Sequence, residues 1–230
     1  RPAHQGRVGQ SHEAQLRQYD QRMTSVAIID YGLCNLDSIT RAIEECGGTP
    51  IVADGPGPVA SADLLILPGV GAFPKAIANL HSRGLASALR DRVADGVTPL
   101  LGICLGMQLL ADSSVEFGGA AGLGVLPGRV ETLVAKAPDE RVPHVGWNEL
   151  QRHAESELLR DVPPEKDFYF VHGFHLVCSD PEHVVATTPY CGGFVSVVQR
   201  KNIFGTQFHP EKSQRAGFAL LRNFVSLRSA

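Results

Sequence analysis

Residues 98–111 read TPLLGICLGMQLLA, an apolar stretch that carries one cysteine between two glycines. Its first part, residues 98–103, has the composition of a short buried strand, and its second part, residues 105–111, has helical spacing. A cysteine at such a junction matches the G-x-S-x-G nucleophile elbow, with sulfur in place of oxygen. The sharp turn would expose the Cys104 side chain at the carboxyl end of the strand, where the helix N-terminus stabilises negative charge on sulfur.

The same alternation of strand and helix patterns extends to both sides of this turn. Short apolar runs predict strands at residues 26–29, 50–53, 64–67 and 98–103. Helical spacing predicts helices at residues 36–46, 74–80, 85–93 and 105–111. β-Branched and aromatic residues predict further strands at residues 167–178, 184–188 and 194–209. We therefore predict one α/β domain with a mostly parallel sheet flanked by helices and a strand-rich second half.

Composition and charge exclude several classes of function. The 230 residues include 21 Lys and Arg against 24 Asp and Glu, for a formal net charge of −3, and no basic run suits nucleic acid or an anionic membrane. No apolar run approaches the roughly 18 residues that span a bilayer. The five cysteines form no CxxC pair, which favours a reduced, cytoplasmic protein. We expect no cofactor and no metal, since His172 and His175 would face opposite sides of a strand.

A cysteine nucleophile that forms an acyl intermediate needs a proton carrier, and His209 in the segment Phe208-His209-Pro210-Glu211 is the candidate. Pro210 favours an extended backbone at His209, so that Glu211, two residues on, projects to the same side. Its carboxylate would fix the imidazole tautomer and leave the second ring nitrogen to face the thiol of Cys104. Taken alone, each motif has a simpler explanation: a cysteine packed between glycines, and a structural histidine.

A second turn, Pro68-Gly69-Val70-Gly71, follows the strand predicted at residues 64–67. Backbone amides in a glycine-bearing turn at the carboxyl end of a strand can stabilise a developing oxyanion. Judged by spacing alone, a plain connection between a strand and a helix explains these residues slightly better. The turn becomes a candidate for catalysis only in combination with Cys104.

The first 22 residues differ in composition from the rest of the chain. They are rich in Gln, Arg and His and contain no apolar core, so that a secretory signal does not fit, and their acidic residues argue against a transit peptide. We expect residues 1–22 to be a disordered or expression-derived extension and residues 23–230 to form a single domain.

Three segments together resemble the class-I, triad-type glutamine amidotransferases, a flavodoxin-like α/β family. They are GICLGMQLL at residues 102–110, PGVGAF at residues 68–73 and FHPEKS at residues 208–213. Within that family, three further segments are most similar to the glutaminase subunits of imidazole glycerol phosphate synthases. These are DYG at residues 30–32, PHVGWN at residues 143–148 and FYFVH at residues 168–172. The resemblance extends from about residue 26 to the C-terminus.

The resemblance implies that Cys104 attacks the side-chain amide of glutamine, which releases ammonia and leaves a γ-glutamyl thioester. His209 would protonate the leaving ammonia and then activate water, with Glu211 as its orienting acid. The backbone amides of Val70 and Leu105 would bind the oxyanion. The residues implied to bind glutamine are Gly69, Gly71, Gln108, His172, Gly173 and Phe174.

The resemblance also implies a protein partner. Ammonia would pass through a tunnel to a (β/α)8 synthase subunit, in a heterodimer that makes imidazole glycerol phosphate in histidine biosynthesis. Asn35, Trp147 and Lys212 match positions that the family places at or near the interface. The resemblance implies no cofactor, no nucleic acid and no membrane.

The chain departs from the family pattern near the partner surface and the glutamine pocket, but not in the triad. Cys34 and Cys191 stand where the family usually has glycine, and Gly173 and Phe174 replace a hydroxyl residue and tyrosine. Two other enzymes therefore stay open: a paralogue that supplies ammonia to another synthase, and a free-standing hydrolase of γ-glutamyl compounds or peptides. The third alternative, a non-catalytic scaffold, is disfavoured by the intact triad.

Overall fold

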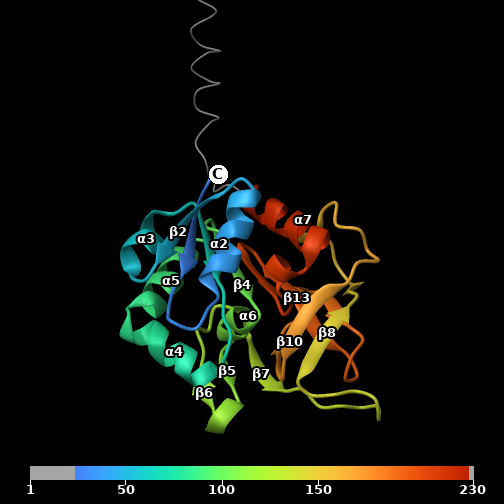
Figure 1. Cartoon of the computed structure of the whole chain (residues 1–230). Coiled ribbons are helices and arrows are strands. Elements are labelled where there is room, and N and C mark those ends of the chain that lie inside the picture. The colour runs from blue at the N-terminus through green and yellow to red at the C-terminus, as the bar shows by residue number, and fades with distance from the viewer. Residues whose placement is uncertain (1–23, 228–230) are drawn as a thin grey trace, which may run out of the picture.

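Eight strands form the central sheet, in the order β2-β1-β3-β4-β14-β13-β12-β9 (Figure 1). This computed structural model describes residues 24–227, so the extension predicted at residues 1–22 lies outside the described residues. The first five strands in this order are parallel: β2 (Thr49–Ala53), β1 (Ser25–Ile29), β3 (Leu64–Leu67), β4 (Leu100–Ile103) and β14 (Ile203–Thr206). The other three pair antiparallel: β13 (Phe194–Arg200), β12 (Val184–Thr188) and β9 (Gln151–Arg152).

Helices cover both faces of the parallel part of the sheet (Figure 1). On one face lie α2 (Leu36–Glu45) and α7 (Gln214–Val225). On the other lie α3 (Pro56–Ser61), α4 (Phe73–Ser82), α5 (Leu85–Val93) and α6 (Leu105–Leu109). Because successive strand residues point to opposite faces, β1 contributes to both cores: Val26 and Ile28 to the first, Ala27 and Ile29 to the second.

Two smaller sheets lie beside the central one. Strand β8 (His144–Asn148) pairs antiparallel with β10 (Phe168–His172). The other small sheet has the order β11 (Phe174–Cys178), β7 (Gly128–Thr132), β5 (Ser113–Ser114) and β6 (Ala120–Ala121). Four short 3-10 turns complete the fold: η1 (Glu116–Gly118), η2 (Glu157–Leu159), η3 (Pro181–His183) and η4 (Pro210–Lys212). Within residues 24–227, no helix has both the length and the apolar character needed to cross a membrane.

The predicted fold class is confirmed, and the second half is richer in strands as expected. The segment predicted as a strand at residues 167–178 is two strands, β10 and β11, which separate at Gly173 and join different sheets. Residues 194–209 likewise divide into β13 and β14 at a turn that contains Lys201 with φ 53°. The sequence pattern gives no sign of α3, because its first turn contains prolines and glycine, which also suit a loop.

Three neighbouring parallel strands end at one edge of the sheet, and each leads into a segment with predicted chemistry. Strand β3 leads into the turn at residues 68–71, β4 leads into Cys104, and β14 leads into residues 207–211. The register pairs Leu67 with Gly102 and Thr206 with Ile103. The carboxyl ends of these strands therefore bring the three segments together, as expected for a parallel α/β sheet.

Two glycines allow α6 to lie directly against the strands. A Cβ atom on Gly106 would stand 1.7 Å from the carbonyl oxygen of Leu67, and one on Gly102 would stand 2.7 Å from the Cα atom of Met107. Both neighbours are backbone atoms, which cannot move aside as the end of a flexible side chain can. The glycines on either side of Cys104 are therefore required by the packing of the helix on the sheet.

We expect the substitution Gly106→Ala to lower the melting temperature by about 2–12 °C. Overpacking of this kind costs roughly 1–3 kcal/mol, and each kcal/mol shifts the melting temperature of a domain of this size by about 2–4 °C. Gly57→Ala is the matched control, since a Cβ atom there meets nothing within 4 Å and alanine favours a helix. Circular dichroism during thermal unfolding measures the melting temperature of each variant. Equal melting temperatures for Gly106→Ala and Gly57→Ala would contradict the packing argument.

Candidate active site

Cys104 occupies a strained turn between β4 and α6. Its backbone has φ 54° and ψ −111°, a conformation that costs a residue with a side chain about 1–3 kcal/mol. Two hydrogen bonds hold the turn: the Cys104 amide donates to the Thr206 carbonyl oxygen over 2.7 Å, and the Gln108 amide donates to the Cys104 carbonyl oxygen over 3.2 Å. The turn places the sulfur at the N-terminus of α6, as the elbow motif predicts.

His209 is held from three sides beside this turn. Its Nδ1 lies 2.8 Å from Oε1 of Glu211, its amide donates to the Tyr169 carbonyl oxygen over 2.9 Å, and its carbonyl accepts from the Ser213 hydroxyl over 2.6 Å. Because a carboxylate only accepts, Nδ1 carries the proton of this bond. The second nitrogen, Nε2, is buried and makes no hydrogen bond within the described residues. It is the nitrogen left for proton transfer.

Glu211 reaches His209 by a different backbone path from the one expected. His209 is extended, with φ −97° and ψ 98°, but Pro210 then begins the 3-10 turn η4, which contains Glu211. The turn brings the carboxylate back onto Nδ1, whereas the sequence argument relied on the alternation of an extended strand. Both side chains are nearly inaccessible, with exposed fractions of 3% and 7%.

The charges around His209 favour its protonated form. Burial alone would lower the pKa of the imidazole, but the interactions with Cys104 and Glu211 outweigh burial and raise the pKa to about 10. At neutral pH the arrangement favours an imidazolium that stands ready to donate from Nε2.

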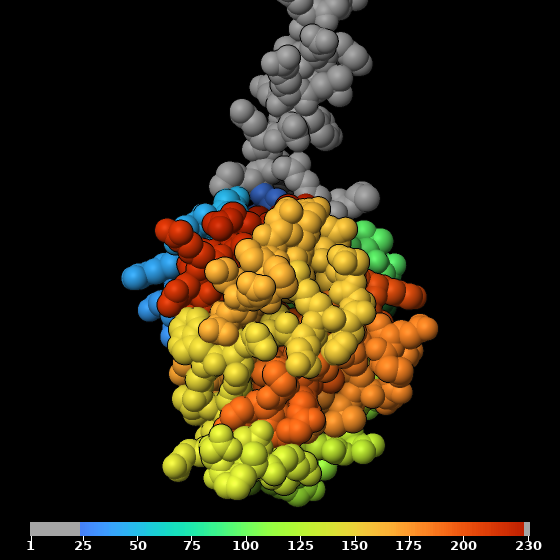
Figure 2. All heavy atoms as spheres, turned by 90° about the vertical axis from the view of Figure 1, so that its right-hand side faces the viewer, coloured from blue at the N-terminus to red at the C-terminus, as the bar shows by residue number. Residues whose placement is uncertain are grey.

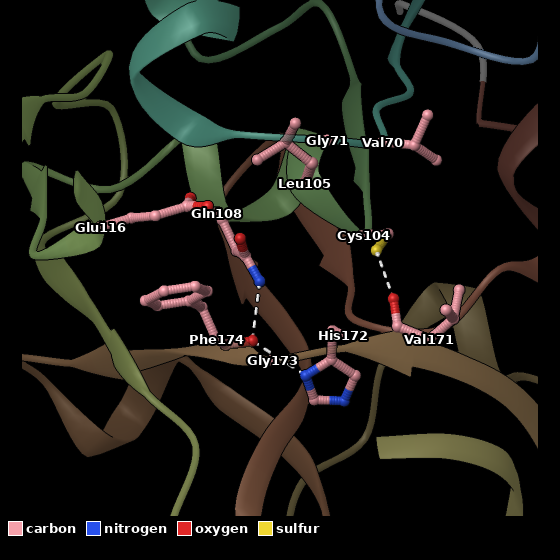
Figure 3. A pocket seen from close by; sticks show the side chains of 10 residues that line it. All are labelled: Val70, Gly71, Cys104, Leu105, Gln108, Glu116, Val171, His172, Gly173 and Phe174. Carbon is pink, nitrogen blue, oxygen red and sulfur yellow. Dashed lines mark hydrogen bonds between the residues drawn. The ribbon is translucent and has the colours of Figure 1, made fainter. Parts of the chain in front are cut away.

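A cavity of about 190 Å³ opens beside the sulfur of Cys104 (Figure 3). Its walls come from the β3–α4 turn, from α6, from η1 and from the junction of β10 and β11. The residues that line it are Val70, Gly71, Cys104, Leu105, Gln108, Glu116, Val171, His172, Gly173 and Phe174. Of the six residues expected to bind glutamine, five line the cavity. Gly69 does not, because it packs beneath the turn, where a Cβ atom would stand 2.1 Å from the Tyr31 hydroxyl oxygen.

A network of amide groups connects the wall of this cavity to the sulfur. The Gln108 amide group donates to the Phe174 carbonyl oxygen over 2.8 Å and to Oε1 of Gln207 over 3.1 Å. Gln207 in turn lies 3.8 Å from the Cys104 sulfur through its own amide nitrogen. Because Phe174 contributes its carbonyl oxygen, its side chain is not what fixes Gln108. The departure from the family pattern at position 174 therefore leaves this contact intact.

Glu116 is a site residue that no sequence motif reveals. It is buried to 7% exposure in η1 and lines the cavity. Its Oε2 accepts from the Phe73 amide over 2.8 Å, which leaves the rest of the carboxylate for the cavity. The sequence around Glu116 is a glycine-rich loop. Only the approach of α4 to this loop, which the sequence does not show, would have identified Glu116 as a site residue.

The two backbone amides predicted to bind the oxyanion differ in their hydrogen bonding. Leu105 is the first residue of α6, so its amide has no partner inside the helix. The Val70 amide instead donates to the Leu33 carbonyl oxygen over 2.9 Å. The turn is anchored before Val70 by a hydrogen bond from the Tyr31 hydroxyl to the Pro68 carbonyl oxygen over 2.9 Å, and Gly71 follows with φ 100°. In this structure, therefore, only the Leu105 amide is available to an oxyanion.

The three residues expected at a partner interface lie outside the cavity. Asn35 caps α2 by accepting from the Ser38 amide over 3.4 Å, and Lys212 is exposed in η4. Trp147 is 44% exposed on β8, with its ring centroid 5.7 Å from that of Tyr169. Figure 2 shows the side of the molecule that the second half of the chain forms.

Of the other two departures, only Cys191 has a glycine-like backbone. Its φ is 53°, whereas Cys34 has no positive φ. The Cys191 amide donates to Oε1 of Glu140 over 2.6 Å, a contact that holds the strained turn in place. Cys34 instead directs its thiol towards the Ile29 carbonyl oxygen, 3.8 Å away.

Comparison with known proteins identifies the family. The family described as "Glutamine amidotransferase class-I" matches residues 27–227. The chain is 48% identical over 205 residues to "Imidazole glycerol phosphate synthase subunit HisH" of Moorella thermoacetica, which covers 89% of this chain and 96% of that protein. The chain belongs to the class-I glutamine amidotransferases. The subunit of the same name from Salinibacter ruber is also 48% identical to this amidotransferase, over 87% of this chain and 93% of that protein.

Solved structures support the same fold. A crystal structure described as a glutamine amidotransferase superposes with a TM-score of 0.68 at 20% identity and covers 88% of this chain and 97% of its own. PurLQS from Thermotoga maritima superposes with a TM-score of 0.61 at 19% identity, over 89% and 98% of the two chains. At such identities the likeness to this amidotransferase shows the fold alone.

The raised pKa of His209 predicts how the stability of this amidotransferase depends on pH. Since folding raises that pKa from 6.5 to about 10, the protonated ring stabilises the fold fully below about pH 6.5, and the contribution is lost as the pH rises through about 10. We expect the free energy of unfolding of the wild type to fall relative to that of His209→Gln over this range. Urea unfolding at several pH values measures both, and a constant difference would contradict the prediction.

Proposed function

We propose that this protein is the glutaminase subunit of an imidazole glycerol phosphate synthase, with Cys104 as its nucleophile, His209 as its acid and base, and Glu211 as the orienting acid. The observation that carries the proposal is the convergence of these side chains beside a cavity of amino-acid size. The strongest support for the pathway is the 48% identity to the Moorella thermoacetica subunit over almost its whole length. The product of the subunit is ammonia for histidine biosynthesis.

In the first half of the reaction, the sulfur of Cys104 attacks the side-chain amide carbon of glutamine. The carbonyl oxygen takes up the electron pair of the double bond and becomes an oxyanion. When the pair returns, the bond between carbon and nitrogen breaks, and His209 donates its Nε2 proton so that the nitrogen leaves as ammonia. A γ-glutamyl thioester remains on Cys104. The raised pKa of His209 means that its ring already carries the required proton.

In the second half, His209 acts as a base. Its Nε2 is now free, and it takes a proton from a water molecule whose oxygen attacks the thioester carbon. The bond between carbon and sulfur breaks, glutamate leaves, and the pair of Cys104 and His209 returns to its starting protonation. Throughout both halves, the bond from Nδ1 to Glu211 keeps Nε2 directed at the reacting atoms.

The Val70 amide controls how well the oxyanion is stabilised. The Leu105 amide offers one donor, and a single oxyanion donor is worth roughly 10²–10³ in rate. The Val70 amide becomes the second donor only after its bond to the Leu33 carbonyl oxygen breaks. We therefore infer that the subunit alone hydrolyses glutamine slowly and that reorientation of the Val70 peptide accelerates the reaction.

The far end of the cavity suits the α-amino acid part of glutamine. Glu116 offers a buried carboxylate there, the kind of group that pairs with an α-ammonium. Gln108, the backbone at Gly173 and Phe174, and Gly71 of the β3–α4 turn also line the cavity. These contacts select a free amino acid with an amide side chain long enough to reach Cys104.

A synthase partner fits the outer face beside the triad. Val70, Val145 and Trp147 are large apolar side chains with exposed fractions of 40%, 58% and 44%, and apolar surface of this kind marks protein interfaces. Asn35 and Lys212 would border the same interface. We propose a heterodimer with a (β/α)8 synthase subunit that receives the ammonia directly, because free ammonia would escape into water.

We further propose that residues 23–230 form one amidotransferase domain that works in the cytoplasm. All five cysteines are unpaired, as expected in a reducing compartment. The free thiols agree with a site whose nucleophile must stay reduced.

The substitution Cys104→Ala tests the proposed function directly. We expect it to reduce glutamine hydrolysis by at least about 10³-fold, because no other group can form the thioester. Cys178→Ala removes a thiol outside the cavity and serves as the control. Glutamate release is measured with and without a (β/α)8 synthase subunit and its ligand. Hydrolysis by Cys104→Ala at the wild-type rate would end the proposal, and so would a wild type that never responds to any such synthase.

The substitution Glu116→Gln tests the binding of the α-ammonium. The amide still accepts from Phe73 but carries no charge, so we expect the KM for glutamine to rise by about 10–100-fold, the effect of losing one charged hydrogen bond. The value of kcat should change much less, because Glu116 does not touch the triad. Glu157→Gln, on the exposed turn η2, is the control. An unchanged KM in Glu116→Gln would exclude this role.

A further inference from the structure

A buried chain of hydrogen bonds runs behind the glutamine cavity. The side-chain amide nitrogen of Asn148 lies 2.8 Å from Nε2 of His144. Nδ1 of His144 lies 3.4 Å from Nε2 of His172, and Nδ1 of His172 lies 2.8 Å from the Phe174 carbonyl oxygen. The chain of hydrogen bonds starts on β8 and ends on a wall of the cavity. Its last contact, from His172 to the Phe174 carbonyl oxygen, is drawn in Figure 3. None of these contacts involves the catalytic triad.

The last acceptor sets the direction of every bond in this chain. A carbonyl oxygen only accepts, so Nδ1 of His172 must carry a proton. In the neutral ring Nε2 then only accepts, and it receives its proton from Nδ1 of His144. By the same reasoning Nε2 of His144 accepts from the Asn148 amide group. All three donors therefore point towards the cavity, and both histidines hold the same tautomer.

Burial keeps both rings neutral, which the single direction requires. It lowers the pKa of His144 to about 4. It also lowers the pKa of His172, to about 3, and nearby His144, His175 and His209 add to this effect, while the bond to Phe174 opposes it. At neutral pH each ring carries one proton, so the order of donors and acceptors has no charged alternative.

Ring packing holds the two imidazoles in place. His144 stacks on Tyr190 with ring centroids 4.1 Å apart at 24°, and its centroid lies 5.1 Å from that of Phe170. The Tyr190 hydroxyl is itself tied to the backbone of Arg141 through two hydrogen bonds. His172 meets the edge of Phe194 at 4.7 Å. Neither ring can turn without displacing its aromatic neighbours.

The end of the chain meets a group that lines the cavity. The Phe174 carbonyl oxygen also accepts from the amide group of Gln108 over 2.8 Å, so His172 and Gln108 share its two lone pairs. If His172 presented a lone pair instead of a proton, the carbonyl would be repelled, and Gln108 would keep only its longer bond to Oε1 of Gln207. The orientation of Gln108 therefore depends on a proton that Asn148 and His144 determine from the other side.

We propose that His144 and Asn148 are positioning residues, which act through His172 to hold the Phe174 carbonyl oxygen and Gln108 in the arrangement that binds glutamine. This inference rests on the proposed glutaminase function. It assigns to the inner face of β8 a role in substrate binding, although neither His144 nor Asn148 touches the cavity. The outer face of the same strand carries Val145 and Trp147.

The tautomers are measured first, on the full chain labelled with ¹⁵N-histidine. Two-bond ¹H–¹⁵N correlations distinguish a proton on Nδ1 from one on Nε2, and the signals of His144 are assigned as those missing in His144→Phe. We expect both His144 and His172 to be neutral with the proton on Nδ1. A proton on Nε2 of either ring in the wild type would overturn the proposal, whatever the activity of the enzyme.

Kinetics then separate positioning from a loss of fold. His144→Phe keeps the stack on Tyr190 but removes the donor to His172, so we expect the KM for glutamine to rise by about three- to tenfold, the effect of one neutral hydrogen bond. The value of kcat should fall by less. A purely structural role would reduce the active fraction, which lowers kcat and leaves the KM unchanged. His153→Phe, at an exposed histidine bonded to Thr187, is the control.

Substitutions of Asn148 test the direction of these hydrogen bonds, because aspartate has nearly the same side-chain shape as asparagine. Asn148→Asp replaces the donor by an acceptor, so His144 must place a proton on Nε2, which the spectrum reports. Asn148→Ala only removes the donor, and because Asn148 is partly exposed, water can replace it. We expect the KM to rise more in Asn148→Asp than in Asn148→Ala. Equal KM values in the wild type, His144→Phe and Asn148→Asp would contradict this inference. A wild type without glutaminase activity would instead contradict the proposed function.

Discussion

The close approach of α6 to β3 and β4 is the contact on which the site depends. At Gly102 and Gly106 the backbones of the helix and the sheet lie in direct contact, so the chain turns sharply between them, and the residue at the turn is Cys104. The strain of its backbone is held by the buried apolar residues on either side and by the bond to Thr206. Because Thr206 ends the adjacent strand β14, the same contact fixes where the segment with His209 begins. One packing requirement therefore places both the proposed nucleophile and its proposed base.

The charged pair of His209 and Glu211 and the cavity for the substrate lie on different sides of Cys104. On one side of Cys104, His209 and Glu211 are almost completely buried, and the charge on the ring is tolerated there because the carboxylate of Glu211 pairs with it. On the other side, the cavity offers mainly neutral amide and carbonyl groups, with Glu116 as its acidic residue. Substrate recognition and proton transfer thus use different neighbours of the same sulfur atom.

The parts of the site that are local in sequence were open to prediction. Gly102 to Gly106 is a contiguous motif between a strand and a helix, and His209 and Glu211 are two residues apart, so the elbow, the candidate base and the parallel sheet could be predicted from pattern. The roles of the triad became specific only through the resemblance to a known family. The roles of Glu116, His144 and Asn148 could not be predicted from the sequence, because they depend on segments that meet only in the folded chain. The state of the Val70 amide belongs to this second group, since its partner is the carbonyl of Leu33. Nothing in the composition of the turn reveals that bond.

The two faces of strand β8 carry different kinds of residue. Its residues alternate between exposed Val145 and Trp147 and the inward His144 and Asn148, since neighbouring side chains of a strand point to opposite faces. Under the proposed function, substitutions at the outer positions alter the surface offered to a synthase, and substitutions at the inner positions alter the binding of glutamine. Mutations in the two sets can accumulate independently. Under the proposed function, such a subunit can therefore change its synthase partner through the outer positions while its binding of glutamine stays the same.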